Sequence, residues 1–415
     1  MNDVDGQASL TPIVWTRSDG LGELQAHLGS ERQDAETWYS AGLALLEEGR
    51  HEEAATALHA ALTLHPHSLA IESAYATALA SLGAAHQAAN LLEDIIHRNP
   101  GDGWAYFHLA ALRYRQGDCE LAAQLWETAE RLVDDPTDSL ENLAMVRRRL
   151  GQVEDERRCW QRAAKHDPTN PMVLHMLAAV GLTPTPPRAD GAYITCMFDR
   201  FAPDFDRVLA QLQYHVPDLC EEWMHDQFGP PRRHLRVLDA GCGTGLCGAR
   251  LRPWAAELVG VDLSARMLEH AARRGVYERL ERADLIEFLR ANRGGFDVVV
   301  AGDVLCYFGD LSPFAQCALA SLRAEGLLGF SVERAGEDEL GDREEPGYII
   351  RHHGRYAHTC RHIKHAFGGG TLRLAEIAVR LELGEAVGGY WVSAKRKDHA
   401  RTAGMRVPTT SAAEP

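Results

Sequence analysis

The apolar positions of the N-terminal half recur with helical spacing, and the whole pattern repeats every 34 residues. Each repeat carries a glycine, at Gly49, Gly83, Gly117 and Gly151. Small residues that let two helices approach alternate with larger ones that fill the space between neighbours, as at Ala54, Leu58, Ala88, Leu92, Ala122 and Trp126. Units of this length cannot bury their apolar faces alone and therefore stack into an array. The pattern predicts four two-helix units and a capping helix over residues 35–181.

The apolar pattern of the C-terminal half is different. Amphipathic stretches separate four runs with strand character, residues 235–240, 257–261, 296–301 and 326–332. Such alternation predicts an α/β, Rossmann-like domain with a mostly parallel, doubly wound sheet. Two final runs, residues 372–383 and 386–394, are joined by a short turn that contains glycine. We expect them to form an antiparallel pair that closes one edge of the sheet.

A proline-rich segment separates the two patterns. Pro184, Pro186 and Pro187 follow one another closely, and a helix cannot continue through them. We therefore expect a multidomain chain. Its parts are a partly disordered N-terminal segment (residues 1–34), the repeats with their cap (35–181), a linker (182–192), the α/β domain (193–397) and a disordered tail (398–415).

Composition narrows the range of partners and compartments. The formal net charge of −16 repels phosphate backbones and anionic lipids, so we expect neither a nucleic acid nor a membrane as partner. The start of the chain is acidic and polar, and the sequence contains no apolar run of about 18 residues. The nine cysteines lack the paired spacing of zinc sites. These features predict a cytoplasmic protein with reduced thiols and no metal site.

The candidate chemistry begins where the first predicted strand runs into a glycine-rich turn, VLDAGCGTG at residues 237–245. Glycine lets the backbone pass against a ligand, and ligands of open α/β sheets bind at the carboxyl ends of the strands. A dinucleotide fingerprint would place its third glycine at position 246, which is leucine. Asp239 would repel a pyrophosphate but attract the ammonium group of a methionine moiety. Both details favour S-adenosylmethionine over a dinucleotide.

Two more carboxylates follow the ends of apolar runs. Asp262 ends the second predicted strand, where it can accept hydrogen bonds from both ribose hydroxyls. Asp284 closes a short run and can accept from an adenine amino group while Leu285 packs on the ring. Alternatively, Asp284 caps the N-terminus of a helix. Three carboxylates at successive strand ends favour a cofactor site.

These motifs resemble the class I S-adenosylmethionine-dependent methyltransferase superfamily over about residues 193–396, and the repeats resemble tetratricopeptide (TPR) repeats. The chain is similar to bacterial TPR-repeat methyltransferases through FDRFAPDFD (198–206), AGDVLCY (301–307) and GRYAH (354–358). The resemblance implies a seven-stranded sheet. It implies a cofactor site that comprises Asp239, Gly241, Cys242, Gly243, Gly245, Asp262, Leu263, Met267, Asp284, Leu285 and Asp303. The three glycines at 368–370 depart from the family pattern of a helix end and a strand start.

The resemblance also implies where an acceptor binds. Residues 302–307 are expected to line the methyl-transfer point, and helices from residues 193–217 to cover the cofactor as a lid. His358 and Tyr307 are the catalytic candidates if the acceptor needs a base. We expect a small-molecule, peptide or carrier-bound acceptor that the TPR groove helps to recruit, or a protein partner in that groove. Two alternatives remain: a TPR interaction protein with a non-catalytic methyltransferase-like domain, and an enzyme that transfers a group other than methyl from S-adenosylmethionine.

Overall fold

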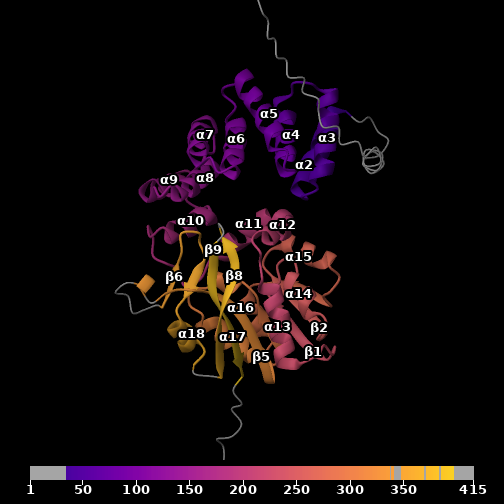
Figure 1. Ribbon diagram of the computed structural model, residues 1–415, viewed down its shortest axis with the longest axis vertical. Coiled ribbons are helices and arrows are strands. Elements are labelled where there is room, and N and C mark those ends of the chain that lie inside the picture. The colour runs from indigo at the N-terminus through magenta and orange to yellow at the C-terminus, as the bar shows by residue number, and fades with distance from the viewer. Residues whose placement is uncertain (1–33, 337, 341–346, 369–370, 383–384, 397–415) are drawn as a thin grey trace, which may run out of the picture. The chain divides into compact units, whose positions relative to one another are not determined.

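The computed structural model describes residues 34–336, 338–340, 347–368, 371–382 and 385–396. The chain forms two compact units, residues 1–167 and 168–415 (Figure 1). The predicted tail and the predicted N-terminal segment, apart from Asp34, lie outside the described residues. In the part of the chain that the structure describes, no helix combines the length and the apolar character that a bilayer crossing requires.

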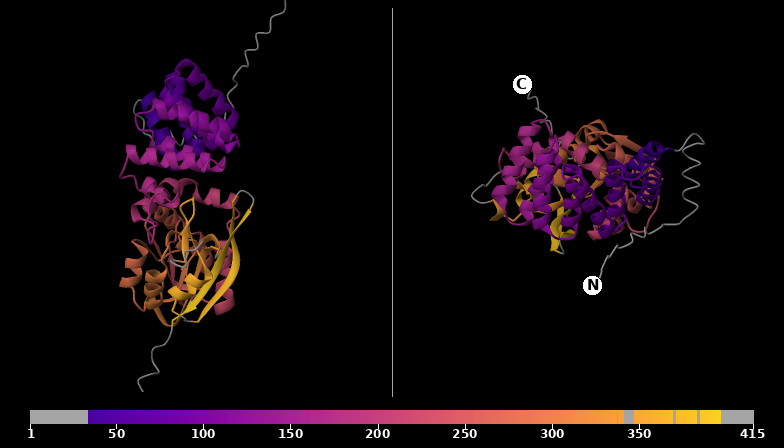
Figure 2. Two further views of the ribbon diagram at one scale, coloured as in Figure 1. Left: turned by 90° about the vertical axis from the view of Figure 1, so that its left-hand side faces the viewer. Right: turned by 90° about the horizontal axis from the view of Figure 1, so that it is seen from above.

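The described part of the first unit consists of eight helices in four successive pairs (Figure 2). The helices are α2 (Ala35–Glu47), α3 (His51–Leu64), α4 (Leu69–Ser81), α5 (Ala85–Arg98), α6 (Gly103–Arg115), α7 (Cys119–Leu132), α8 (Thr137–Arg149) and α9 (Val153–His166). The first helix of each pair begins 34 residues after its predecessor, as the sequence predicts. The glycines of the repeat have positive φ angles of 73° to 89° and turn the chain within each pair. The repeat array is therefore confirmed.

Close helix contact within each pair depends on small residues. At Gly42 an added Cβ would lie 2.5 Å from Cγ of Leu58, and the corresponding residues of later repeats, Ala76, Ala110 and Ala144, are completely buried. In the second helix of each pair the close contact falls on Ala54, Ala88 and Ala122, also completely buried. The fourth repeat departs from this pattern, because Glu156 occupies the equivalent position and is 2% exposed.

The second unit is built on one sheet of nine strands among the described residues. Its parallel part has the order β3 (Arg279–Arg282), β2 (Ala255–Asp262), β1 (Leu235–Ala240), β4 (Phe296–Ala301) and β5 (Leu322–Arg334). Beyond β5, β9 (Glu385–Lys395) pairs antiparallel with it, and β8 (Leu372–Glu382) pairs antiparallel with β9. These seven strands give the predicted mostly parallel sheet with its antiparallel edge. Two short strands, β7 (Tyr356–His358) and β6 (Tyr348–Ile350), extend the end of β5.

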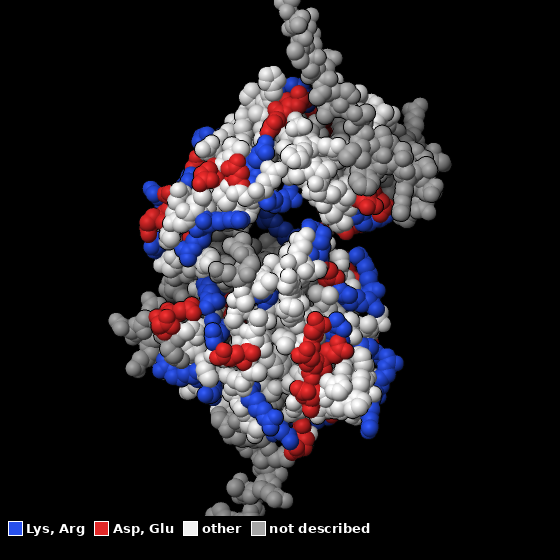
Figure 3. Space-filling view, viewed as in Figure 1, with Lys and Arg blue, Asp and Glu red and all other residues white. Residues whose placement is uncertain are grey.

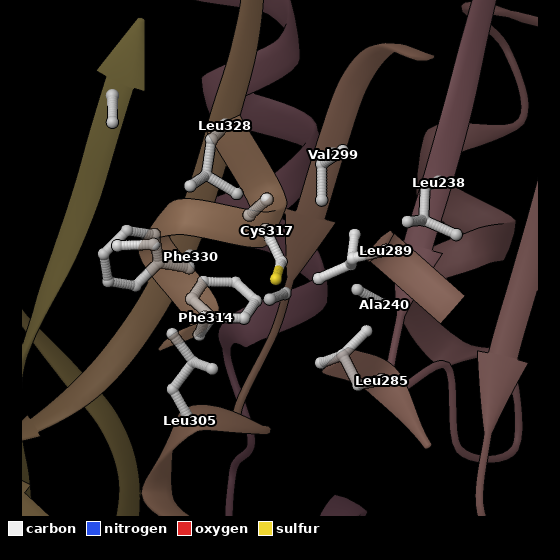
Figure 4. Close-up of a cluster of buried hydrophobic side chains, with 14 of the residues drawn as sticks. Leu238, Ala240, Leu285, Leu289, Val299, Leu305, Phe314, Cys317, Leu328 and Phe330 are labelled. Carbon is white, nitrogen blue, oxygen red and sulfur yellow. The ribbon is translucent and has the colours of Figure 1, made fainter. Parts of the chain in front are cut away.

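Alternate residues along the central strands point to opposite faces of the sheet, and each face has its own apolar core. On one face, Leu238, Val299 and Phe330 pack against α16 (Leu285–Ala291) and α17 (Ser312–Ser321) (Figure 4). On the other face, Val237 and Val298 pack against α13 (Val216–Phe228) and α14 (Leu246–Leu251). Because both faces are covered, the carboxyl ends of the strands are the places where a ligand can reach the sheet.

Short helices at the start of the second unit adjoin these strand ends. They are α10 (Pro171–Ala179), α11 (Gly191–Phe201), a 3₁₀ turn (Ala202–Asp204) and α12 (Phe205–Gln211). We expected α10 to cap the repeats, but it is grouped with the second unit. The Nε2 atom of His175 lies 2.8 Å from the carbonyl oxygen of Gly354, and its ring stacks on Tyr193 with centroids 3.8 Å apart. These contacts bind α10 to the α/β fold.

The proline-rich segment packs along the same edge. The carbonyl oxygen of Pro187 accepts hydrogen bonds from the backbone N–H groups of Gly309 and Asp310, and that of Pro186 accepts one from the Tyr356 hydroxyl. Near the other end of the unit, α18 (Cys360–Ala366) ends before β8 begins at Leu372. Residues 369–370 of the glycine run lie outside the described residues.

Candidate active site

A cavity of about 290 Å³ lies at the carboxyl ends of the parallel strands. Its floor comes from the glycine-rich turn after β1 and from the residues that follow β2 and β4. Aromatic residues from α11 and α12, including Phe198, Phe201 and Phe205, form another part of its wall. This volume is close to the lower end of the range for small-molecule sites, roughly 300–1,000 Å³.

The three glycines of the turn have positive φ angles but serve different purposes. At Gly241 (φ 72°) an added Cβ would lie 2.3 Å from Cγ2 of Val304, so the turn is packed against the strand-four loop. At Gly245 (φ 88°) a Cβ would meet Tyr277 at 3.0 Å. At Gly243 (φ 53°) the nearest atom is on Phe205, 4.0 Å away, and both residues line the cavity. Gly243 is therefore the glycine at which the backbone itself is open to a ligand.

Asp262 joins the end of β2 to this turn. Its Oδ2 atom accepts a hydrogen bond of 2.9 Å from the backbone N–H of Gly243, and its Oδ1 atom accepts one of 2.9 Å from Ser264. Burial raises the pKa of Asp262. Asp262 and Leu263 both line the cavity, as does Cys242. Asp262 thus holds the glycine-rich turn through Gly243 and also lines the cavity.

Asp284 caps a helix, which is one of the two roles that its sequence context allows. Its Oδ1 atom caps α16 by accepting from Ile286 and Glu287, at 3.0 and 3.2 Å. Its Oδ2 atom forms an ion pair of 3.0 Å with Arg188. Asp284 and Leu285 also line the cavity. They follow β3, whereas Gly241 follows β1, and β2 lies between these two strands in the sheet.

Asp239 is placed differently from the expectation. It is 1% exposed and is not among the residues that line the cavity; the Tyr277 hydroxyl donates to its Oδ2 atom at 2.7 Å. Burial raises the pKa of Asp239 to about 7. Two further residues of the predicted set, Gly245 and Met267, also lie outside the lining.

Asp303 and Tyr307 follow β4 and both line the cavity. Asp303 has a φ angle of 54°, which is rare for a residue with a side chain, and its backbone N–H donates to Ser331 Oγ at 2.7 Å. Burial raises the pKa of Asp303 and, strongly, that of Tyr307. The Tyr307 ring packs edge-on against Phe198, with centroids 5.5 Å apart. The structure thus brings the strand-four loop and the lid segment together.

His358 does not reach the cavity, and its predicted role as a base needs correction on geometric grounds. It is completely buried on β7, outside the lining residues. Its Nε2 atom lies 2.7 Å from the carbonyl oxygen of Phe308, so this nitrogen carries the proton and donates. Burial lowers the pKa of His358 to about 4. The GRYAH motif therefore contributes a structural histidine to the fold.

Two features of the site escaped the sequence reasoning. The first is a pair of hydrogen bonds between the lid segment and the cofactor motifs: Asp206 to Thr244 and Asp199 to Ser264, each 2.5 Å between oxygen atoms. Asp199 and Asp206, two of the three aspartates in FDRFAPDFD, are seven residues apart, and this pair of carboxylates was the available signal. The second is a pair of arginines in the wall, Arg355 and Arg380. A buried arginine on a strand gives no sequence signal of its own.

Comparison with known proteins agrees with this geometry. A family described as "Methyltransferase domain" matches residues 238–328, which include the glycine-rich turn, Asp262 and Asp303. The second unit carries a class I methyltransferase domain. The repeats match a family described as "Cytochrome c-type biogenesis protein H TPR domain" over residues 21–141. The chain thus combines a TPR array with the methyltransferase domain.

Curated relatives match this methyltransferase domain over part of their length. Methyltransferase-like protein 27 of Homo sapiens is 43% identical over 106 residues, which cover 25% of this chain and 43% of the relative. The malonyl-acyl-carrier protein O-methyltransferase of Enterobacter lignolyticus is 31% identical over 146 residues, 35% of this chain and 55% of the relative. The chain spans about half the length of the curated relatives it matches.

Solved methyltransferase structures are also similar. The magnesium protoporphyrin IX methyltransferase of Synechocystis with bound S-adenosylmethionine has 22% sequence identity and a TM-score of 0.34. The comparison covers 48% of this chain and 84% of that one.

Proposed function

We propose that this chain is an S-adenosylmethionine-dependent methyltransferase acting on a small-molecule, peptide or carrier-bound acceptor that the TPR array helps to recruit. The observation that carries the proposal is the position of Asp262. Its carboxylate holds the backbone of Gly243 at 2.9 Å and faces the cavity in which a nucleoside would lie. A carboxylate at the end of the second strand is suited to two vicinal hydroxyls.

The residues of the cavity fit the proposed cofactor. Gly243 leaves the backbone open where a ligand approaches, and Asp262 offers the remaining lone pairs of its carboxylate to a ribose. Leu285 gives an apolar surface for a purine ring beside the Asp284 carboxylate. The aromatic wall from α11 and α12 excludes water from the strand ends. A carboxylate for the hydroxyls, an apolar face for the base and a glycine for close approach make a consistent site.

When bound, S-adenosylmethionine supplies a methyl group on a positively charged sulfur, a reactive electrophile. The chain then has to align the acceptor at about 3 Å and keep water out. Val304 and Tyr307, which follow β4, and Phe198 from α11 surround the point where we expect transfer. Tyr307 and Asp303 supply the polar groups of this part of the wall. Because burial raises the pKa of Tyr307, its hydroxyl stays protonated and can donate a hydrogen bond to the acceptor. His358 is buried outside the cavity and keeps its Nε2 proton on backbone carbonyl groups.

Recruitment by the repeats is the second part of the proposal. The array presents Trp104 with 53% of its surface exposed, and the ring contacts Phe107 and His108 on the same helix with centroids 5.7 and 6.3 Å apart. A large exposed aromatic group of this kind is typical of contact with a partner. On the face that Figure 3 shows, acidic and basic side chains are interspersed, which favours specific contacts over binding to a polyanion.

The cofactor part of the proposal is tested by calorimetric titration with S-adenosylhomocysteine. We expect saturable binding, weakened by roughly 1–3 kcal/mol in Asp262→Ala because the ribose hydroxyls lose their acceptor. The matched control is Asp297→Ala, a carboxylate of β4 that pairs with Arg323 at 3.0 Å and lies outside the cavity. A protein that gives no heat of binding would be a scaffold with a non-catalytic domain, and the proposal would be wrong.

The reaction is tested with methyl-labelled S-adenosylmethionine and fractionated extract. Label should enter an acceptor, and mass spectrometry should find S-adenosylhomocysteine as the cofactor product; methylthioadenosine would instead show transfer of the aminocarboxypropyl arm. For recruitment, Trp104→Ala should slow turnover of a protein or carrier-bound acceptor. Leu64→Ala, which changes an equally exposed residue of another repeat, should not. Equal turnover by both variants contradicts recruitment through Trp104.

A further inference from the structure

Two arginines from different strands meet in the wall of the cavity. Arg380 lies on β8 and Arg355 directly precedes β7, and both line the cavity together with Asp303. They share one oxygen of Glu333 on β5: Arg355 Nε lies 2.8 Å from Oε1, and Arg380 Nη2 lies 2.5 Å from it. Two guanidinium groups are thus fixed next to each other at the acceptor end of the site.

Glu333 binds both guanidinium groups from a position outside the cavity wall. It is completely buried and is not among the residues that line the cavity. Burial alone raises the pKa of Glu333, but Arg355 and Arg380 outweigh this effect and hold that pKa below its usual value. The carboxylate therefore stays ionised, and it keeps the guanidinium groups in place without standing between them and the cavity.

The placement of these charges favours one kind of acceptor over others. A buried guanidinium group costs several kcal/mol of desolvation unless charged or polar partners offset it. The proposed cofactor adds its own positive sulfur to the same strand ends. Arg380 Nη1 also lies 3.5 Å from Oδ2 of Asp303, so one lining carboxyl group stands against two guanidinium groups and the sulfur. A cationic amine would be repelled by these three positive charges, and a neutral acceptor would gain no attraction between charges. An anion is attracted by all three, and the planar guanidinium matches a carboxylate in shape.

Another part of the cavity wall is aromatic. The rings of Phe198, Phe201 and Phe205 lie together, with centroids 6.2 Å apart for the first and third and 5.2 Å apart for the second and third. All three line the cavity on the side of α11 and α12. The site thus combines a cationic position with an extended aromatic surface.

We propose that the acceptor is a carboxylic acid with an apolar body, whose carboxylate binds Arg355 and Arg380 while its body packs against Phe198, Phe201 and Phe205. This inference rests on the proposed methyltransferase function and names its substrate class. A purely structural network would need the same Glu333 contacts but would give the cavity no preference for an anion. The two explanations therefore differ in what binds.

The test uses three probes that share a phenyl body and differ in head group: phenylacetate, 2-phenylethanol and 2-phenylethylamine. Each is titrated calorimetrically into the full-length protein saturated with S-adenosylhomocysteine. We expect phenylacetate to bind about tenfold more tightly than the alcohol, and the amine to bind most weakly, because a guanidinium–carboxylate contact is roughly twice as strong as a neutral hydrogen bond. Absence of a preference for the carboxylate, including absence of binding by all three probes, overturns the proposal.

Matched variants separate the anion site from the structural network. Arg355→Gln removes a guanidinium group that lines the cavity, whereas Arg351→Gln removes one that pairs with Glu333 at 3.6 Å but does not line it. We expect Arg355→Gln to weaken phenylacetate about tenfold and Arg351→Gln to leave it unchanged. Arg355→Lys, which keeps the charge, should fall between them. Equal losses in the two glutamine variants would make the network structural and overturn the proposal.

S-adenosylhomocysteine binding distinguishes the possible failures. If the wild type does not bind it, the proposed function itself has failed. If the wild type binds it but Arg355→Gln does not, the guanidinium groups hold the carboxylate of the cofactor, and the inference about the acceptor is wrong while the function stands. Unchanged cofactor binding in Arg355→Gln, together with lost binding of phenylacetate, supports the inference.

Discussion

The hydroxyl of Tyr277 donates a hydrogen bond of 2.7 Å to Asp239, and the same ring fills the space beside three glycines, Gly245, Gly248 and Gly260. The contacts of Tyr277 thus help to hold the glycine-rich turn in place. The hydrogen bond does not suffice to keep Asp239 ionised, because burial raises the pKa of that carboxyl to about 7. A carboxyl group below the cofactor turn is therefore sensitive to pH in the neutral range.

The stability of the second unit should consequently fall as pH rises. The folded-state pKa of Asp239 lies above the unfolded value of about 3.9, so its stabilising contribution is present below pH 4 and is lost as pH rises through about 7. Asp239→Asn keeps an acceptor for Tyr277 but cannot ionise. Urea denaturation at pH 5, 6, 7 and 8 should show the wild type losing roughly 2–3 kcal/mol relative to this variant between pH 5 and pH 8. A pH-independent difference between the two would contradict the assignment.

Alanine substitutions at two glycines of the turn should differ in their effects on stability and on ligand affinity. In Gly241→Ala the new Cβ would overlap Val304 at 2.3 Å, so thermal unfolding should show a loss of roughly 2 kcal/mol or more. In Gly243→Ala the strain is limited to the positive φ angle, about 1 kcal/mol, but the methyl group enters the cavity. Its affinity for S-adenosylhomocysteine should fall at least about tenfold, because a ligand would have to move away from the turn. Equal effects of the two substitutions on both measurements would show that Gly243 is not a ligand contact.

The bond between Asp206 and Thr244 should help to hold the lid segment over the cavity. Arg274 reinforces it by pairing with Asp206 and donating to the carbonyl oxygen of Thr244 at 2.6 Å. Thr244→Val keeps the shape but removes the hydroxyl, and we expect faster dissociation of S-adenosylhomocysteine by about three- to tenfold in stopped-flow measurements. The control is Asp204→Asn, which alters a carboxylate that pairs with Arg207 inside the same segment. If the dissociation rate is unchanged in Thr244→Val, or changes equally in the control, the bond between Asp206 and Thr244 does not hold the lid segment over the cavity.

A substitution in the fourth repeat should stabilise the array. Glu156 occupies the position that alanine holds in the other repeats, and burial raises its pKa in spite of Arg148, whose Nη1 atom lies 3.5 Å away. Because the folded-state pKa is raised, the wild type loses stability as pH rises above about 4.3. Glu156→Ala should therefore raise the free energy of unfolding at pH 8, and raise it by less at pH 4. Glu154→Ala, at an exposed neighbour, should change it by less than about 0.5 kcal/mol. A destabilised Glu156→Ala would mean that the ion pair with Arg148 outweighs the burial.

Much of the fold could be predicted because its signals are local. The 34-residue period indicated the repeats, and β1 and β4 have the predicted bounds because each is a mostly apolar run that is followed directly by a glycine. The strands β6 and β7 could not be predicted, since each has three residues and depends on pairing at the end of β5. Short strands of this kind are stabilised by their neighbours and carry too few residues to show a period.

The candidate site also contains some residues that the sequence could indicate and others that it could not. Gly243 and Asp262 line the cavity as their motif suggested, because motif spacing fixes the backbone close to the ligand. The depth of Asp239 and the position of His358 could not be predicted, because burial depends on residues far away in the sequence, such as Tyr277 and Phe308. Arg380 and Glu333 lie 47 residues apart and meet only through the register of β5, β9 and β8. Sequence spacing alone could not indicate that pair.

The helix α10 has a consequence for how the two halves of this chain can be separated or exchanged. Its His175 is bonded to Gly354 and stacked on Tyr193, so it supports both the loop that carries Arg355 and the first helix of the lid. A protein engineer who cut the chain at the proline-rich segment would remove this support and leave the methyltransferase domain without these contacts. The portable unit starts before Pro171, and any chimaera that carries this methyltransferase domain under a different repeat array should keep α10 with the domain.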